Sequence, residues 1–120
     1  MKVSRAVTLG RRAGRLNLEL ETGAQFVDAL QLQAGPNDPE GVTEGTPLDW
    51  PDGTESWIVV TNKASRAEQR WDSIILQSWM RWQVQSDLVD LVSREAWAEL
   101  WIKYDGAEPI LWAEGPVSWT

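Results

Sequence analysis

The strongest constraint on the fold is the regular alternation of apolar and polar residues in several short segments. In residues 15–21, Leu16, Leu18 and Leu20 alternate with polar residues, and residues 79–84 and 96–104 repeat this pattern. A period of two places successive side chains on opposite faces of a β-strand. Several short strands separated by turn residues indicate an all-β domain.

Two further segments complete the expected strands. Residues 54–61 are apolar on both parities, which is typical of a central strand covered on both faces. Residues 71–84 contain two expected strands that separate near Gln77-Ser78. Asp28 interrupts the apolar parity of another strand, and we expect a β-bulge or bend there.

The remaining segments predict connections. Residues 34–49 are rich in glycine, proline and acidic residues and predict a long surface loop, and residues 62–70 predict a polar connection or one helical turn. Residues 86–93 predict a short helix at one end of the core, with Ser86 or Asp87 as its N-cap. We therefore expect an all-β fold: an antiparallel β-sandwich of seven or eight short strands, with at most one short helix near residues 86–93.

The C-terminal part predicts a β-hairpin that turns at Asp105-Gly106. In this register Leu100 lies opposite Leu111, and Lys103 forms a favourable cross-strand pair with Glu108. The apolar parity of the first strand faces the core, so the opposite parity faces outward. The tryptophans of the hairpin that share this outward face are Trp97, Trp101 and Trp112.

The charge is unevenly distributed along the chain. The net charge is −7, but the first 15 residues contain five basic residues and no acid, and the rest contains 18 acidic and 6 basic residues. We therefore divide the chain into a basic N-terminal arm, residues 1–14, and a single β-sandwich domain, residues 15–120. The arm is either a solvated terminus or a contact with an acidic surface of a neighbouring subunit. The basic residues that would make this contact are Lys2, Arg5, Arg11 and Arg12.

The same composition argues against several partners and reactions. An acidic body does not favour nucleic acid, because phosphates require a positive surface, and no apolar run approaches the ~20 residues of a membrane span. Histidine and cysteine are absent, which removes the usual general base, metal ligands and thiol nucleophile. We expect a non-enzymatic protein with no catalytic residue, no metal site and no cofactor.

Two groups of carboxylates are weaker candidates for chemistry. Asp87 and Asp90 could act as a carboxylate pair, but they lie in a helix-capping context. The long loop offers oxygen ligands that Ca²⁺ would accept, without the spacing of an EF-hand; we expect a solvated loop. Its carboxylates are Asp38, Glu40, Glu44 and Asp49.

Tryptophan dominates the aromatic residues, with nine copies against one phenylalanine and one tyrosine. We expect Trp82 and Trp57 to lie in the core. Three explanations are open for Trp97, Trp101 and Trp112: a cross-strand cluster that covers the sheet, a platform for carbohydrate, or a protein interface, where tryptophan and arginine are enriched. We favour the protein interface, because a monomer seldom exposes an aromatic patch without a use.

Three stretches carry a resemblance: LELETGAQFVDALQL, PLDWPDGTESWIVV and AELWIKYDGAEPILWAEGPV. They contain a Gly-Ala-x-Phe strand start, a Trp-Pro-x-Gly-Thr turn and a terminal strand that ends in Trp-x-x-Gly. In this order and spacing, from about Leu16 to Val117, the chain resembles the LtfC-like small β-sandwich proteins of actinobacteriophages. The resemblance implies a β-sandwich encoded by a tailed phage and supplies no catalytic residues. The basic start and the many tryptophans are not features of it.

Together these observations predict a virion structural protein. We favour a minor capsid or decoration protein that cements the virion through contacts with the major capsid protein or with copies of itself, as a homo-oligomer or part of a symmetric assembly. Its place is the virion, assembled in the host cytoplasm. The alternatives are a tail or baseplate component and, from another class, a carbohydrate-binding module that attaches the virion to a host surface. The fold alone does not decide among them.

Overall fold

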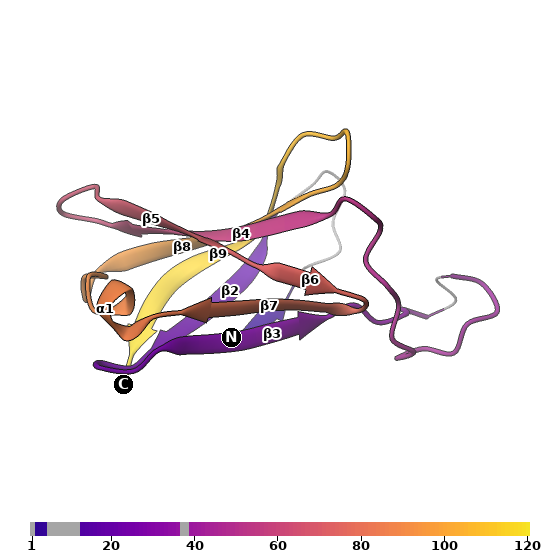
Figure 1. Ribbon diagram of the computed structural model, residues 1–120, viewed down its shortest axis with the longest axis horizontal. Helices are drawn as coiled ribbons and strands as arrows, with labels where there is room; N and C mark the ends of the chain where they lie inside the picture. Colours follow the sequence, from indigo (N-terminus) through magenta and orange to yellow (C-terminus); the bar gives the residue numbers. More distant parts are fainter. Residues whose placement is uncertain (1, 5–12, 37–38) are drawn as a thin grey trace.

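The alternating segments build two sheets that pack face to face. The computed structural model describes residues 2–4, 13–36 and 39–120. The six-stranded sheet has the order β1 (Lys2–Ser4), β2 (Gly14–Leu20), β9 (Ile110–Trp119), β8 (Ala96–Lys103), β4 (Glu55–Asn62), β5 (Glu68–Asp72). The three-stranded sheet has the order β3 (Phe26–Gln31), β7 (Trp79–Val84), β6 (Ile74–Leu76). The short helix α1 (Ser86–Val89) lies at one end (Figure 1). The predicted β-sandwich, with almost no helix, is confirmed.

The core lies between the sheets and is filled by the apolar parity of the strands. Along β2, residues 16, 18 and 20 are buried and their neighbours are exposed, and β8 and β7 show the same alternation. Leu100 and Trp82 are at most 1% exposed, and Trp82 donates its indole N–H to the Trp71 carbonyl at 3.1 Å. Each large apolar side chain buried in this way contributes ~1.5–3 kcal/mol to stability. The predicted core position of Trp82 is confirmed.

One strand pair departs from the predicted antiparallel pairing. β2 and β9 run parallel, with Leu18 beside Val117, whereas the other described pairs are antiparallel. Parallel neighbours require a long crossover connection. Here that connection comprises the whole three-stranded sheet together with β4, β5, α1 and β8, which come between β2 and β9 in the chain.

Gly115 lets β2 and β9 approach each other. A Cβ atom at this position would lie 2.0 Å from the main-chain oxygen of Leu16. That oxygen belongs to the backbone and cannot turn away as a flexible side chain can. The pairing of the two strands therefore requires glycine at this point.

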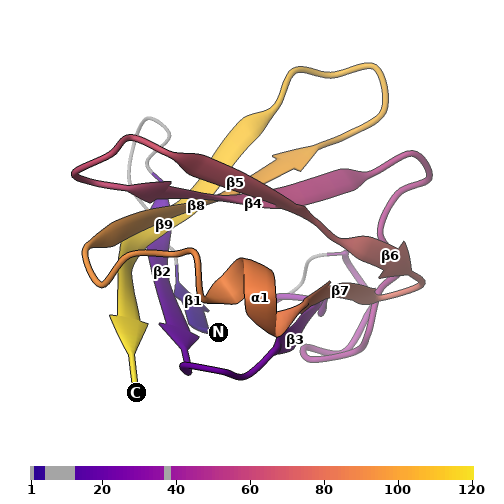
Figure 2. The ribbon, with the colours of Figure 1, turned by 60° about the vertical axis from the view of Figure 1, so that its left-hand side comes forward.

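The segment expected to form one strand before the Gln77-Ser78 turn divides at Ser73. β5 ends before this residue in the large sheet, and β6 begins after it in the small sheet. The Ser73 amide donates to the Ser56 carbonyl at 3.0 Å, and the two serine hydroxyls bond each other. Figure 2 shows β5 continuing into β6 at this corner. Ser73 therefore carries the chain from one sheet to the other.

Three smaller expectations are wrong. Asp28 causes no bulge, because β3 pairs with β7 in continuous register and the Asp28 carboxylate accepts the Ala29 amide at 2.7 Å. The N-cap of α1 is Gln85, which makes no side-chain capping hydrogen bond. The part of residues 62–70 from Glu68 onward is strand, because it pairs with β4.

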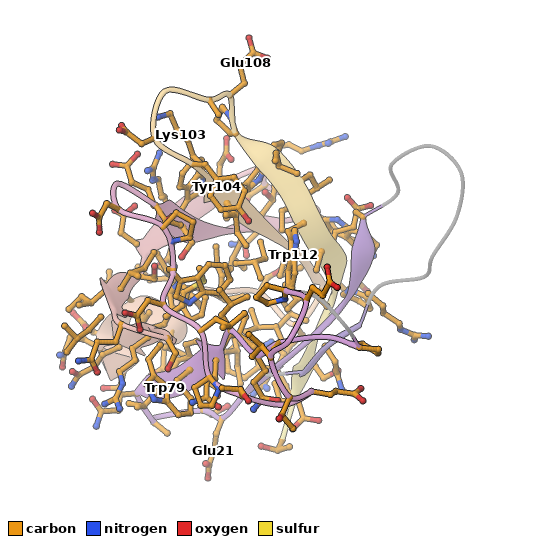
Figure 3. All side chains as sticks on the ribbon, turned by 90° about the vertical axis from the view of Figure 1, so that its right-hand side faces the viewer. Glu21, Trp79, Lys103, Tyr104, Glu108 and Trp112 are labelled. Carbon is orange, nitrogen blue, oxygen red and sulfur yellow. The ribbon has the colours of Figure 1, made fainter. Side chains whose placement is uncertain are left out.

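The C-terminal hairpin has a different register from the one predicted. Leu100 lies opposite Ala113, and an irregularity between Leu100 and Trp101 shifts the pairing there, so that Trp101 lies opposite Leu111. Lys103 contacts Glu55 of β4 at 4.0 Å. Glu108 stands apart from Lys103 at the tip of the hairpin (Figure 3). The loop is longer than two residues, and this moves every pair.

Among the described residues, no helix is long and apolar enough to cross a membrane.

We predict that Gly115→Ala destabilises the protein, because the new methyl group would collide with the backbone of β2. Overpacking of this kind costs ~1–3 kcal/mol and sometimes more. Thermal unfolding followed by circular dichroism measures the change. Gly35→Ala is the matched control, because no atom lies within 4 Å of the added Cβ there. An equal effect of the two substitutions would contradict the role of Gly115.

Candidate functional site

The outer face of the small sheet exposes large apolar side chains. Ile74 is 75% exposed, Leu76 is 69% exposed and Val27 is 62% exposed. Cross-strand pairing places Leu76 beside Trp79. We call this surface the apolar face; it consists of Val27, Ala29, Gln31, Ile74, Leu76, Trp79, Arg81 and Gln83, of which the two glutamines and the arginine are polar.

The apolar face contains one basic group and a hollow. The Arg81 guanidinium lies 5.8 Å from the centre of the Trp79 ring, within the range of a cation–π contact. A hollow of about 300 Å³ is lined by residues that include Val27, Ile74 and Arg81. A monomer seldom exposes a contiguous apolar surface without a partner. The face is therefore a candidate interface for another protein.

The apolar face could be predicted from the sequence only in part. The alternation in 79–84 places Met80 and Trp82 inside, so Trp79 and Arg81 had to point outward. The run Ile74–Leu76 is apolar throughout, however, and its parity cannot be read from the sequence alone. The pairing of β6 with β7 in the structure shows that Ile74 and Leu76 point outward.

The outer face of the large sheet forms a second candidate surface. Thr61 and Trp97 are cross-strand neighbours, as are Trp57 and Trp101, and Glu99 lies opposite Glu114. We call this surface the tryptophan face; it includes Trp57, Val59, Thr61, Glu68, Arg70, Trp97, Glu99, Trp101 and Glu114. The two faces are the outer surfaces of opposite sheets, so they point away from each other (Figure 2).

Trp57 is buried, as expected, but it lies on the tryptophan face rather than between the two sheets. Its neighbours Ser56 and Ile58 take the inward parity of β4, where they pair with the buried side of β8. The Arg70 guanidinium lies 4.1 Å from the centre of the Trp57 ring and bonds Asp72 at 2.9 Å. Trp57 is only 8% exposed although it faces outward. β4 was expected to be covered on both faces, and on its outer face the cover comes from side chains of the same sheet, such as Arg70.

The three tryptophans predicted to form one outward cluster are separated. Trp97 and Trp101 lie half-buried on the outer parity of β8. Trp112 packs against the hydrophobic core instead, and in Figure 3 it lies over the body of the sandwich rather than at the hairpin tip. The cause is the irregularity of the hairpin at Leu100/Trp101, which the expected register lacked.

Glu99 is an acidic group on the tryptophan face whose surroundings disfavour its charge. Burial raises the pKa of Glu99 above its ordinary value of 4.5, and the negative charges of Glu114 and Glu68 raise it further. A hydrogen bond with the Trp101 side chain lowers the pKa and so opposes this effect. The indole N–H is a donor only, so Trp101 donates to the Glu99 carboxylate.

The predicted basic arm lies largely outside the described residues. Lys2 belongs to β1, which pairs with β2 and so extends the large sheet. Arg5, Arg11 and Arg12 fall outside the residues that the structure describes.

The two carboxylates considered as a possible pair, Asp87 and Asp90, lie in and beside the short helix α1. Asp90 accepts the Gly23 amide at 2.9 Å and so ties the α1 segment to the turn after β2. Asp87 lies in the first turn of α1. Within residues 2–4, 13–36 and 39–120, no group of three or more carboxylates is arranged to hold a metal ion; Asp38 lies outside this part of the chain.

The fold and its two opposed faces define a small β-sandwich domain whose candidate sites are surfaces. The sequence matches the family described as "LtfC-like, beta-sandwich domain" over residues 12–120. The chain therefore belongs to the LtfC-like family, and the predicted resemblance is confirmed. Membership is compatible with a phage structural protein. A search of the curated proteins found no match.

We predict that Glu99→Gln raises the melting temperature at pH 7 relative to the unchanged protein. The pKa of Glu99 is higher in the folded state than in the unfolded state, which means that the folded protein favours the neutral carboxyl group. The stability that this neutral group contributes is fully present below pH 4.5 and is lost as the pH rises through the folded pKa. Glutamine stays neutral and keeps an oxygen that accepts the Trp101 N–H.

The difference between the two proteins should disappear below pH 4.5, where Glu99 is protonated in both states. Thermal scans from about pH 3 to about pH 8 measure it. Glu108→Gln, at the exposed tip of the hairpin, is the control and should leave the profile unchanged. A constant difference across this range would show that the effect is not one of charge.

Proposed function

We propose that this protein is a non-enzymatic structural component of a phage virion, with the role of a minor capsid or decoration protein. It attaches through the apolar face to another virion protein, either the major capsid protein or a copy of itself. Its place is the virion, and it joins the particle during assembly in the host cytoplasm.

The apolar face is the observation that carries this proposal. Three of its aliphatic side chains, Val27, Ile74 and Leu76, are each more than 60% exposed, and they lie on one small sheet. Burial of apolar surface contributes ~25 cal/mol per Å². A partner that covers this sheet would remove all three side chains from water at once. Trp79 and Arg81, beside them, are of the residue types that commonly anchor interfaces.

Family membership supports the same class of function. The LtfC-like family match covers residues 12–120, and the family is compatible with a phage structural protein. The described surfaces are suited to contact rather than to chemistry, since their polar groups are spread over open sheets. A position on the tail or baseplate is the alternative within this class.

We predict that Leu76→Asp abolishes incorporation into virions while leaving the melting temperature nearly unchanged. A charge on the covered apolar face would be desolvated without a partner, whereas an exposed position tolerates the change within ~0.5 kcal/mol of folding stability. Virions purified from a phage that encodes the variant are assayed by quantitative immunoblot.

Leu91→Asp is the matched control, because Leu91 is 65% exposed and Leu76 is 69% exposed, but Leu91 follows α1 and lies off the apolar face. It should be incorporated normally. Normal incorporation of Leu76→Asp would contradict the proposed attachment surface. Electron microscopy of particles that carry a labelled copy distinguishes a capsid position from a tail position.

The basic N-terminal residues form a second proposed contact. Lys2, Arg5, Arg11 and Arg12 would meet an acidic surface of a neighbouring subunit, because the rest of the chain carries 18 acidic residues against 6 basic ones. Complementary charge of this kind speeds association and fixes orientation.

We predict that the triple substitution of Arg5, Arg11 and Arg12 by glutamine weakens assembly and reduces its dependence on salt. The screening length falls from ~10 Å at 0.1 M salt to ~3 Å at 1 M, so the unchanged protein should lose more affinity over this range. Substitution is preferable to deletion of the segment, because deletion would also remove β1. Equal salt dependence of the two proteins would contradict the proposed contact.

A further inference from the structure

A shallow hollow on the tryptophan face combines an aromatic ring with polar groups of both signs. It has a volume of about 570 Å³ and is lined by Thr61, Lys63, Arg66, Trp97 and Glu99. From this combination we propose that the tryptophan face binds a neutral oligosaccharide, with Trp97 as the central stacking platform. This site is distinct from the apolar face and does not depend on the proposed virion attachment.

Trp97 provides the apolar part of the site. It lies on the outer parity of β8, half-buried, between Thr61 of β4 and Pro116 of β9. These two neighbours are small and leave room above the sheet for a ligand. The faces of pyranose rings carry C–H groups, and such a face can lie flat against an indole ring. A planar aromatic ring on a rigid strand is preorganised for this contact, which reduces the entropy lost on binding.

The polar lining suits sugar hydroxyls. Hydroxyl groups both donate and accept hydrogen bonds, so they can pair with the donors Lys63 and Arg66 and with the acceptor Glu99. In the described part of the chain, the ion pairs are those of Arg70 with Asp72 and of Lys103 with Glu55. The donors at the rim of the hollow are therefore not engaged in these pairs.

The turn between β4 and β5 holds Arg66 at this rim. Arg66 adopts a φ of 63°, a left-handed conformation that is uncommon for residues other than glycine. Hydrogen bonds fix the turn: the Arg66 amide donates to the Asn62 carbonyl at 2.9 Å, and the Asn62 amide donates to the Ala67 carbonyl at 2.9 Å. The position at which the side chain leaves the backbone is thus defined by a closed turn.

The surrounding charge selects a neutral ligand. The carboxylates of Glu68 and Glu114 lie close enough to Glu99 for their charges to act on it, and the whole chain has a net charge of −7. Together with Glu99, these two carboxylates outnumber the two basic residues of the lining, Lys63 and Arg66, so a polyanionic chain would meet net repulsion. A neutral oligosaccharide carries hydroxyls for the same donors and acceptors without that repulsion.

Trp101 provides a second contact along the same strand. It lies four residues beyond Trp97 on the outer parity of β8, a separation of ~13 Å at the rise of a β-strand. Trp57, beside Trp101, is already covered by the Arg70 guanidinium. An extended oligosaccharide that follows β8 would therefore stack on Trp97 and Trp101 and pass over Glu99 between them.

The experiment titrates the isotopically labelled full chain with linear hexaoses. The probes are the β-1,4-linked hexaoses of glucose, mannose, galactose and N-acetylglucosamine and the α-1,4-linked hexaose of glucose. The signals followed are the indole N–H resonances of the tryptophans, and calorimetry gives the affinity. At least one hexaose should shift the resonances of Trp97 and Trp101 and leave that of Trp79, on the opposite sheet, unchanged. An acidic probe, the β-1,4-linked hexaose of glucuronic acid, should bind more weakly than the neutral β-1,4-linked hexaose of glucose, which has the same linkage.

Variants define the site. Trp97→Ala should weaken binding of that hexaose by about ten-fold or more, equivalent to ~1.4 kcal/mol. Trp79→Ala is the matched control and should bind as the unchanged protein does; the dispersion of the NMR spectrum verifies that both variants are folded. Trp97→Phe keeps an aromatic ring and should retain most of the affinity.

Three results would overturn the proposal: no hexaose shifts the Trp97 resonance at millimolar concentration, the shifts map to Trp79, or Trp97→Ala binds equally well. If Trp97→Ala instead loses incorporation into virions while no hexaose binds, the tryptophan face contacts protein. Because Leu76→Asp tests the apolar face on the other sheet, failure of either proposal leaves the other measurable.

Discussion

The large sheet depends on the close parallel contact between β2 and β9. Gly115 admits the Leu16 carbonyl where any side chain would collide with it, and the leucines of β2 can then complete the inner surface that β8 and β4 begin. β9 lies between β2 and β8 in the sheet order, so it joins the N-terminal strands to the remainder of the large sheet. Without this contact, the buried leucines of β2 would lose their place in the core, and the two outer faces would lose the rigid sandwich that separates them.

The two outer faces differ in how they satisfy their side chains. On the tryptophan face, aromatic rings are paired with charged groups, as Arg70 covers Trp57 and Trp101 donates to Glu99. On the apolar face, Ile74 and Leu76 remain largely exposed. The tryptophan face therefore leaves little apolar surface in contact with water, and its polar groups remain able to bind a polar ligand. The apolar face would bury more apolar surface if a partner covered it. This asymmetry supports the proposal that one sheet contacts a protein partner while the other remains exposed to solvent.

Much of the fold could be read from the sequence, because burial on one side of a strand imposes a period of two. The parities of β2, β7 and β8 followed directly from it, as did the core position of Trp82. The sequence could not provide long-range pairing: the parallel neighbours β2 and β9 and the passage between sheets at Ser73 depend on contacts between distant residues.

The outward position of Trp97 and Trp101 could be predicted from the sequence. The packing of Trp112 against the core could not, since a single irregularity in register changes the side to which a residue points. The burial of Trp57 could be predicted, but its place on the outer face could not, because the cover there comes from an arginine on a neighbouring strand.

The place of β9 in the sheet has a consequence for biosynthesis. β2 is made early, but in the large sheet its neighbours are β1 and β9, and β9 ends at residue 119. While the nascent chain emerges from the ribosome, β3, β6 and β7 can pair, and so can β4, β5 and β8, yet the pair of β1 and β2 has no edge to join. β2 can join the rest of the large sheet only after β9, the last of these strands in chain order, has been made. Closure of the large sheet therefore depends on a contact between distant residues, which is the kind that forms slowly.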